Sequence, residues 1–195
     1  MNKTRIYGLI GNPVSHSLSA LMHNAGLAYL KIKARYKLFH LEEKELRPFL
    51  ANLKKKNIHN LNITIPYKER VLQLIDGNLS SAVSAIGAAN TLAIDKKNKF
   101  KLFNTDYLGF IEHLKELKVK PKRAAVIGAG GGARAICFAL GKMKAREVVI
   151  YDIDKFRSLA LMKRFNQIFS ATRFLAAGSV EELNLKDKDI LINAS

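Results

Sequence analysis

The sequence is poor in the residues that build disulfides, metal centres and membrane spans. It has one cysteine, Cys137, which excludes an internal disulfide, and it has no tryptophan. Its five histidines show no metal-ligand spacing, so we expect no metal site. No apolar run is long enough to predict a transmembrane helix, and no signal-type apolar region follows the N-terminus. We therefore expect a cytoplasmic protein with no membrane partner.

Acidic residues are also scarce. The chain carries 16 of them against 33 lysines and arginines, a net charge of +17. Such a charge raises nucleic acid as a partner. However, the lysines are scattered, aromatic residues do not interleave with them, and no recognition-helix or zinc pattern accompanies them. We expect a basic surface that attracts anionic small molecules, and DNA binding with a steep salt dependence stays an alternative.

The 195 residues are 48% hydrophobic, which predicts a globular core. Short apolar runs alternate with longer amphipathic ones, a pattern typical of an α/β fold with mostly parallel sheets. Residues 95–98 look like a hairpin turn. The predicted strands are 4–10, 34–41, 59–65, 88–94, 99–104, 123–128, 147–152, 171–176 and 189–193. The predicted helices are 18–30, 42–55, 68–75, 79–85, 107–118, 131–143, 154–167 and 180–184.

Pro121 punctuates the chain just before a new strand and suggests a domain boundary. We expect an N-terminal α/β substrate domain over 1–106 and a connecting helix over 107–119. A partial Rossmann-type dinucleotide-binding domain would then occupy 120–195.

A glycine-rich loop follows the apolar strand 123–128. Gly128 would make the tight turn, Gly130 would let the backbone approach a pyrophosphate, and Ala133 would let helix and strand pack closely. The helix that follows offers free N–H groups to the phosphates. The alternative is a purely structural strand-to-helix turn. The expected cofactor-binding loop consists of Gly128, Ala129, Gly130, Gly131, Gly132 and Ala133.

Acidic residues follow the next predicted strand, near the spacing at which a carboxylate meets the adenosine ribose. Asp152 and Asp154 would accept hydrogen bonds from the ribose hydroxyls and repel a 2′-phosphate, which favours NAD over NADP. Arg157 is a counterargument because it could reach a phosphate. Asp154 could also cap the helix that follows, and both interpretations can hold.

The first half of the chain carries polar residues at the ends of predicted elements. Ser17 and Ser19 lie at the start of a helix, where hydroxyls can cap the helix or bind a carboxylate. In the alternating segment 62–68, Thr64 shares a strand face with Asn62, and Lys68 falls in the first turn of a helix. A lysine is electrostatically misplaced there, which suits proton transfer, although a plain surface lysine is the alternative.

Asn90 begins the next predicted strand, and Asp106 follows its partner strand. The functional interpretation pairs Asp106 with Lys68, each holding the other in position. The alternative makes Asp106 the N-cap of the helix 107–118.

Together these segments resemble the shikimate dehydrogenase family, including its quinate/shikimate branch. They stand in family order and cover nearly the whole chain. The segments are Ser17-Leu18-Ser19 with His23-Asn24, Asn62-Ile63-Thr64-Ile65-Pro66-Tyr67-Lys68, Gly87-Ala88-Ala89-Asn90-Thr91, Asn104-Thr105-Asp106 with Gly109, Gly128-Ala129-Gly130-Gly131-Gly132-Ala133, and Ile192-Asn193-Ala194-Ser195.

The resemblance implies an enzyme that moves hydride between a nicotinamide cofactor and the C3 position of shikimate or 3-dehydroshikimate, in the route to chorismate and the aromatic amino acids. It implies that Lys68 and Asp106 form the catalytic pair and that Ser17 and Ser19 hold the carboxylate. The ring hydroxyls would meet Thr64, Asn90, Lys68 and Asp106. Ala194 would join the cofactor-binding residues.

The chain departs from the family pattern in three places. Ala20 stands where a proline usually follows the second serine, and Asp152-Ile153-Asp154 replaces the Asn-Arg-Thr of the NADP enzymes. The chain ends at Ser195, where relatives continue with a glutamine that binds substrate and with closing helices. Two alternatives therefore stay open: an NAD-dependent quinate/shikimate dehydrogenase, or an inactive nucleotide-binding module. We expect a monomer or a homodimer.

Overall fold

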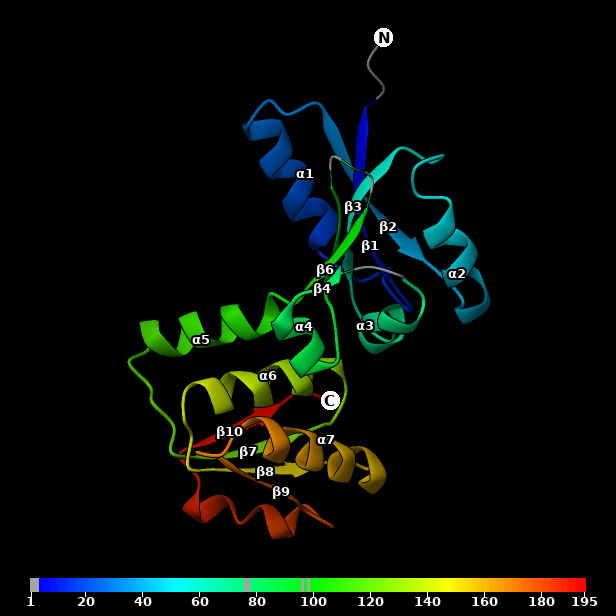
Figure 1. Ribbon diagram of the computed structural model, residues 1–195. Coiled ribbons are helices and arrows are strands. Elements are labelled where there is room, and N and C mark those ends of the chain that lie inside the picture. The colour runs from blue at the N-terminus through cyan, green and yellow to red at the C-terminus, as the bar shows by residue number, and fades with distance from the viewer. Residues whose placement is uncertain (1–3, 76–77, 96, 98) are drawn as a thin grey trace. The chain divides into compact units, whose positions relative to one another are not determined.

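The computed structural model describes residues 4–75, 78–95, 97 and 99–195, and its strands gather in two separate sheets (Figure 1). The chain forms two units. Unit 1 consists of Met1–Ser84 and Ala88–Phe103, and unit 2 consists of Ala85–Gly87 and Asn104–Ser195. The α/β class predicted from the sequence is confirmed, because helices alternate with strands along the chain.

The sheet of unit 1 has the strand order β2-β1-β3-β5-β6-β4. Strand β1 pairs with β2 and β3 in parallel, whereas β5 is antiparallel to both β3 and β6. The sheet is therefore mixed, and the predicted parallel character holds for only part of it. Its strands are β1 (Arg5–Gly11), β2 (Ala34–His40), β3 (Ile58–Ile63), β4 (Asn78–Leu79), β5 (Thr91–Ile94) and β6 (Phe100–Phe103).

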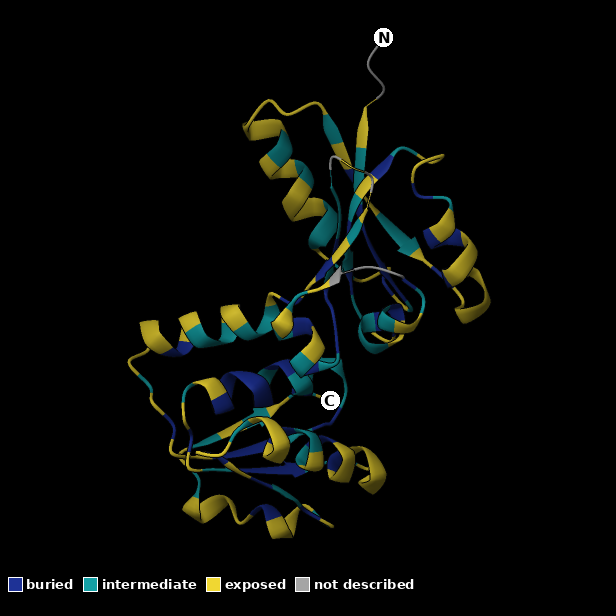
Figure 2. Cartoon of the chain, viewed as in Figure 1, coloured by how far each residue is buried: buried dark blue, intermediate teal, exposed yellow. Residues whose placement is uncertain are grey.

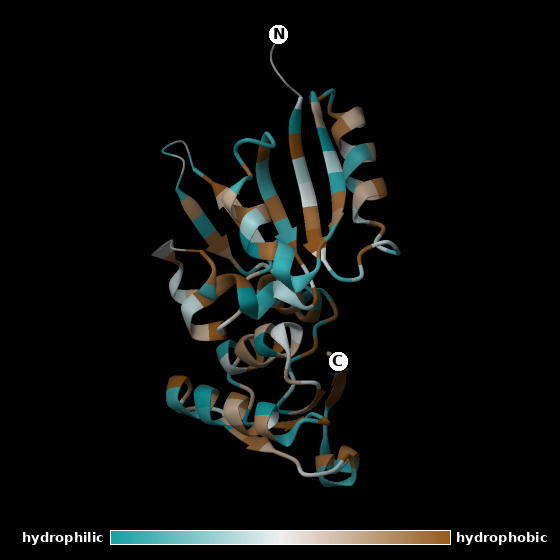
Figure 3. Ribbon diagram, turned by 90° about the vertical axis from the view of Figure 1, so that its right-hand side faces the viewer, coloured by the Kyte–Doolittle hydropathy of each residue, from teal (hydrophilic) through white to brown (hydrophobic). Residues whose placement is uncertain are grey.

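Alternation along β1 assigns the two faces of this sheet. Ile6 and Ile10 contact the larger core, to which α2 (Glu43–Ala51) and α3 (Tyr67–Arg70) contribute. Tyr7 and Leu9 contact the opposite, smaller cluster, which α1 (Ser19–Tyr29) covers through Ala20 and Leu27. In Figure 3 hydrophobic and hydrophilic colours change along the strands, as expected for a sheet covered unequally on its two faces.

Two predicted helices of unit 1 differ from the structure. The predicted helix 68–75 is the one-turn α3 followed by a 3-10 turn, η1 (Val71–Gln73). The predicted helix 79–85 begins later, as α4 (Ser81–Ile86), because Asn78–Leu79 pairs with β6. That strand depends on a partner more than twenty residues away, so no local pattern announces it.

The predicted hairpin turn at 95–98 connects β5 and β6, which do pair antiparallel. The Asp95 carboxylate accepts hydrogen bonds from the amides of Lys97 and Lys99, both at 2.9 Å. Residues 96 and 98 lie outside the described part of the chain.

The sheet of unit 2 is entirely parallel, with the order β10-β7-β8-β9. Its strands are β7 (Arg123–Ile127), β8 (Glu147–Tyr151), β9 (Arg173–Ala176) and β10 (Ile190–Asn193). Helices α5 (Asp106–Glu116), α6 (Gly131–Lys142) and α7 (Lys155–Ile168) accompany them, with 3-10 turns η2 (Glu181–Leu183) and η3 (Leu185–Asp187). The parallel order is that of a dinucleotide-binding half-fold.

An aromatic cluster fills the helical side of this sheet. Phe138 of α6 packs against Phe165 and Phe169, and Tyr107 of α5 meets Phe138 edge-on at 5.1 Å. Figure 2 shows the result, with dark blue along β7, β8 and much of α6. Helix α5 thus packs on α6 as part of unit 2.

Candidate functional site

The segment after β1 presents the two predicted serines. The Ser17 hydroxyl donates to Ser19 Oγ at 3.0 Å and accepts from the Ser19 amide at 3.2 Å. Both side chains are half-buried at the start of α1, whose N-cap position is Leu18 with no side-chain cap bond. The capping role is therefore not filled in the usual way, and the two hydroxyls lie together at a helix N-terminus.

Backbone hydrogen bonds tie the other predicted residues of unit 1 to the same end of its sheet. The Thr64 amide donates to Ile10 O at 2.9 Å, at the carboxyl end of β1. The Ala89 amide donates to Lys68 O at 2.8 Å, which joins the lysine turn to the residue before Asn90. The Tyr67 amide also donates to Thr64 O at 2.9 Å and the Ile63 amide to Asn90 O at 2.8 Å, so the backbone segments that carry Thr64, Lys68 and Asn90 lie side by side.

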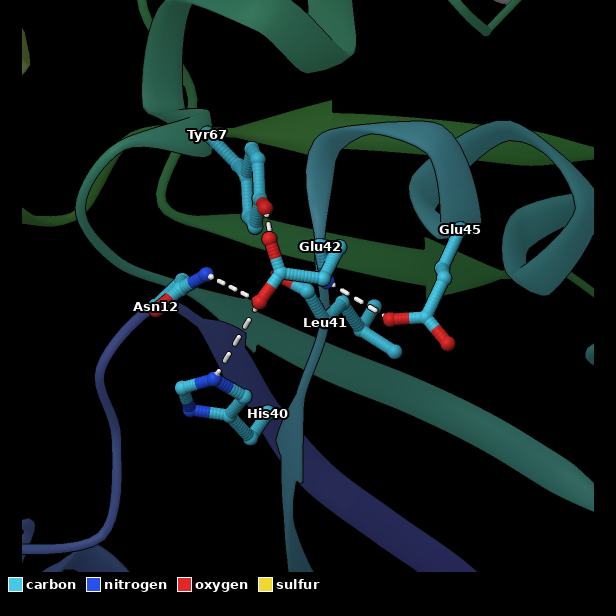
Figure 4. A network of polar contacts seen from close by, with 6 residues as sticks. All are labelled: Asn12, His40, Leu41, Glu42, Glu45 and Tyr67. Atoms are coloured by element: carbon cyan, nitrogen blue, oxygen red, sulfur yellow. Dashed lines mark hydrogen bonds and ion pairs between the residues drawn. The ribbon is translucent and has the colours of Figure 1, made fainter.

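A polar network supports the turn that carries Lys68 (Figure 4). The buried Tyr67 hydroxyl donates to Leu41 O at 2.5 Å, and burial together with the nearby glutamates raises the pKa of that phenol. Asn12 Nδ2 donates to Glu42 Oε1 at 3.4 Å, and the Glu42 amide donates to Glu45 Oε2 at 2.7 Å. The ends of β1 and β2, the start of α2 and the lysine turn are thus held to one another.

A chain of side-chain hydrogen bonds leads to Asn90 across the sheet. The Tyr36 hydroxyl donates to Asn62 Oδ1 at 2.8 Å, and Asn62 Nδ2 donates to Thr91 Oγ1 at 3.5 Å. The Thr91 hydroxyl then donates to Asn90 Oδ1 at 3.0 Å. Tyr36 was not a predicted site residue. Nothing local in the sequence singles it out, since its partner lies 26 residues away.

Asp106 lies in unit 2, as the first residue of α5 rather than its N-cap. The capping interpretation is wrong: Thr105 holds the cap position, and Asn104 Oδ1 accepts from the Asp106 amide at 3.1 Å. Asp106 is therefore the first residue inside the helix.

The glycine loop of unit 2 has the features expected of a phosphate cradle. Gly128 has φ +106, a conformation that favours glycine, and Gly130 is the N-cap of α6. A Cβ on Gly130 would lie 3.5 Å from the Arg157 guanidinium, so the arginine lies over the loop. Gly131 and Gly132 open α6, and Ala129 and Ala133 are buried. The first amides of a helix have no intrahelical partners, so those of α6 can bind an anion.

Asp152 is tied to this loop. Its Oδ2 accepts from the Ala129 amide at 2.6 Å, and its Oδ1 accepts from the Asp154 amide at 2.9 Å. Asp154 caps α7 by accepting from the Phe156 amide, which confirms its predicted capping role. Ala194 also lies at the loop, because its carbonyl would be 2.7 Å from a Cβ on Gly128.

Other kinds of site find no support in the described residues. They hold no group of three histidine, cysteine or acidic side chains that could ligate a metal ion. None of the helices over the described ranges is long and apolar enough to cross a bilayer.

Comparison with known proteins places the chain. A family model for the shikimate dehydrogenase substrate binding domain matches residues 9–92. A shikimate dehydrogenase (NADP(+)) of Caldanaerobacter subterraneus is 36% identical over 98% of this chain and 68% of its own length. The chain belongs to the shikimate dehydrogenase family. The predicted resemblance is thereby confirmed from sequence.

Solved structures of the family agree. Shikimate dehydrogenase from Aquifex aeolicus superposes with a TM-score of 0.87 at 31% identity, covering all of this chain and 70% of its own. Quinate dehydrogenase from Corynebacterium glutamicum, in complex with NAD, gives 0.84 at 28% identity, covering all of this chain and 71% of its own. Solved dehydrogenases named for shikimate and for quinate therefore both share the fold of this chain.

Proposed function

We propose that this chain catalyses the reversible, nicotinamide-dependent reduction of 3-dehydroshikimate to shikimate. The observation that supports the proposal is the set of backbone hydrogen bonds that joins the segments carrying Thr64, Lys68 and Asn90 at one end of a sheet, in a member of this family. By function we propose a substrate domain over residues 1–106, a connecting helix over 107–119 and a dinucleotide domain over 120–195. By packing, residues 104–119 belong to unit 2.

In this proposal the polar groups bind the substrate, orient it and transfer one proton. Ser17 and Ser19 donate hydrogen bonds to the substrate carboxylate from the start of α1. Thr64 and Asn90, with Lys68 and Asp106, contact the ring hydroxyls. The Lys68 ammonium gives a proton to the C3 oxygen in the direction of reduction and takes it back in oxidation, and Asp106 is its catalytic partner by the family resemblance.

The residues of the glycine loop fit a dinucleotide. Side chains are absent where a pyrophosphate would approach, and the Arg157 guanidinium lies beside Gly130. The nicotinamide cofactor, when bound, supplies the hydride acceptor or donor. The loop residues 128–133, with Arg157 and Ala194, would hold its phosphates, and Asp152 and Asp154 would meet the adenosine ribose.

The test is the Lys68→Ala variant, compared with Lys44→Ala on the exposed surface of α2. Shikimate oxidation is followed by the absorbance of the reduced nicotinamide. A positioned proton-transfer group accelerates a reaction by about 10²–10⁴-fold. The kcat of K68A should therefore fall by that factor, while K44A keeps the wild-type kcat. A kcat of K68A within about tenfold of the wild-type value would contradict the assignment.

Binding calorimetry on the same preparations tests the alternative that the chain is an inactive nucleotide-binding module. A nucleotide-binding module without activity would bind cofactor but show no shikimate binding and no turnover. Binding of both compounds, with turnover, supports the enzyme.

We further propose that NAD is preferred to NADP, because two carboxylates at 152 and 154 oppose a 2′-phosphate. The relative of Caldanaerobacter is named for NADP(+), and Arg157 also lies close enough to the loop to attract a phosphate. Comparing kcat/KM for the two cofactors decides the matter, and equal or better use of NADP would refute the preference.

The likeness to the NAD-bound quinate dehydrogenase of Corynebacterium favours a second candidate, quinate oxidation. A higher kcat/KM for quinate than for shikimate would establish it.

A further inference from the structure

We propose that Tyr36 is a positioning residue for the substrate site, whose hydroxyl fixes the orientation of the Asn90 amide through Asn62 and Thr91. The inference rests on the proposed function, in which Asn90 contacts the substrate ring. It adds residues of β2, β3 and β5 that the catalytic assignment does not use.

The sheet geometry makes this connection possible. Tyr36 lies on β2 and Asn62 on β3, and β1 runs between them, so the long phenol side chain must cross one strand to reach the amide. Asn62 and Thr91 are directly opposite in the antiparallel pairing of β3 with β5, where side chains on one face meet. Thr91 is the sequence neighbour of Asn90. Each contact thus follows from register rather than from a mobile loop.

The hydrogen bonds from Tyr36 to Asn90 all run in the same direction of donation. Tyr36 donates to Asn62, Asn62 donates to Thr91 through its nitrogen, and Thr91 donates to Asn90 Oδ1. An asparagine amide can be placed either way round, and its carbonyl and nitrogen ends have opposite roles in hydrogen bonding. Because the Asn90 oxygen accepts from Thr91, the nitrogen is the end of the amide that lies away from Thr91. Asn90 would therefore donate to a ring oxygen, and the substrate hydroxyl would accept.

Tyr36 is itself held firmly. Asn24 of α1 accepts from the Tyr36 amide at 2.9 Å and donates to its carbonyl at 3.0 Å. The His23 ring stacks on the phenol at 4.3 Å between centroids. The residue is only 5% exposed, and burial raises the pKa of its hydroxyl to about 12, so it stays a donor at any ordinary assay pH. The His23-Asn24 pair, one of the segments that resemble the family, therefore holds Tyr36 in place.

A pocket of about 260 Å³ on the α1 side of the sheet supplies a matched control. Tyr7 and Tyr36 both line it, together with Asn62 and Thr91. Tyr7 is not a member of the hydrogen-bond chain, but Tyr7→Phe removes the same hydroxyl from the same surface as Tyr36→Phe. A loss caused by any change in this pocket would appear in both variants.

We expect Y36F to lower kcat/KM for shikimate by about three- to tenfold, the usual worth of one hydrogen bond, while Y7F remains within about twofold of wild type. In the Asn90→Ala background, Y36F should have no further effect, because the group it orients is gone. An equal loss in Y7F, or an undiminished effect of Y36F in the Asn90→Ala background, would overturn the proposal.

The side-chain amide signals of Asn90 in a nitrogen-15 spectrum, assigned by their loss in Asn90→Ala, give a readout that does not need turnover. They should shift in Y36F and stay in place in Y7F. Unchanged signals in Y36F would overturn the positioning role. If the wild-type chain neither binds nor oxidises shikimate, the proposed function fails, and the amide signals still decide whether Tyr36 orients Asn90.

Discussion

Substituting Gly128 by alanine tests whether the glycine loop depends on a close backbone approach. The residue has φ +106, and an ideal Cβ there would lie 2.7 Å from Ala194 O and 2.9 Å from the Ser195 nitrogen. Both neighbours are backbone atoms at the end of β10, which is held to β7 by the bond from the Ala194 amide to Ile127 O at 2.8 Å. The added methyl group must therefore displace a strand end or the loop.

Two costs add in this variant. Holding an L-residue in a left-handed conformation costs about 1–2 kcal/mol of folding free energy, and displacing the backbone contact costs a similar amount. We expect the free energy of unfolding of unit 2 to fall by about 2–4 kcal/mol. Urea unfolding followed by far-ultraviolet circular dichroism measures the loss. Hydrogen exchange at the Ala194 amide should quicken, because that amide holds the displaced strand.

Gly132→Ala is the matched control. Its Cβ would lie 3.9 Å from the same Ala194 carbonyl, an ordinary contact, and the residue is helical. Alanine should leave stability unchanged or raise it by up to about 1 kcal/mol. If G128A unfolds at the same urea concentration as wild type, the close approach does not constrain the loop and our interpretation is refuted.

Two further predictions concern titratable groups of unit 2. The Lys188 ammonium donates to Glu147 Oε1 at 2.7 Å and holds the pKa of that carboxyl below its usual 4.5. The depressed pKa stabilises the fold above pH 4.5, so the stability difference between wild type and Glu147→Gln, about 1–2 kcal/mol, should narrow as the pH falls further. Urea midpoints across pH check this, and a gap that widens in acid would contradict it. Cys137 is buried, and burial raises the pKa of its thiol. A thiol reagent should therefore react with native protein only when the structure around Cys137 opens, and rapid labelling without urea would contradict this.

The fold was predictable wherever a local pattern suffices. The strand-loop-helix around 123–143 was predicted almost to the residue, because a small apolar strand, glycines and an amphipathic helix follow one another. Strand β4 was not, since Asn78–Leu79 is extended only by pairing with β6. The mixed order of the first sheet also depends on which strands meet, and apolar alternation carries no such information.

The candidate site divides in the same way. Ser17, Thr64, Lys68 and Asn90 could be named because each stands at the end of an element, where side chains are free to bind. Tyr36 could not, because its hydrogen bond to Asn62 crosses an intervening strand. The sequence allows Asp106 as the N-cap, but α5 begins at Asp106 itself with Thr105 at the cap position, and sequence patterns do not fix a helix end to one residue.

The cofactor preference should be tested at Ile153 rather than at Asp152. The Asp152 carboxylate is an expected ribose ligand and also accepts from the amides of Ala129 in the glycine loop and of Asp154, so replacing it would change the charge and the backbone structure together. Ile153 is 95% exposed, and the family resemblance aligns it with the arginine of the NADP enzymes. Ile153→Arg should raise kcat/KM for NADP relative to NAD by about tenfold, the worth of one exposed charge-assisted contact, with urea stability unchanged. Ile153→Gln, similar in length but uncharged, should leave the ratio unaltered. A shift of the same size in both variants would show that charge at this position does not govern the choice of cofactor.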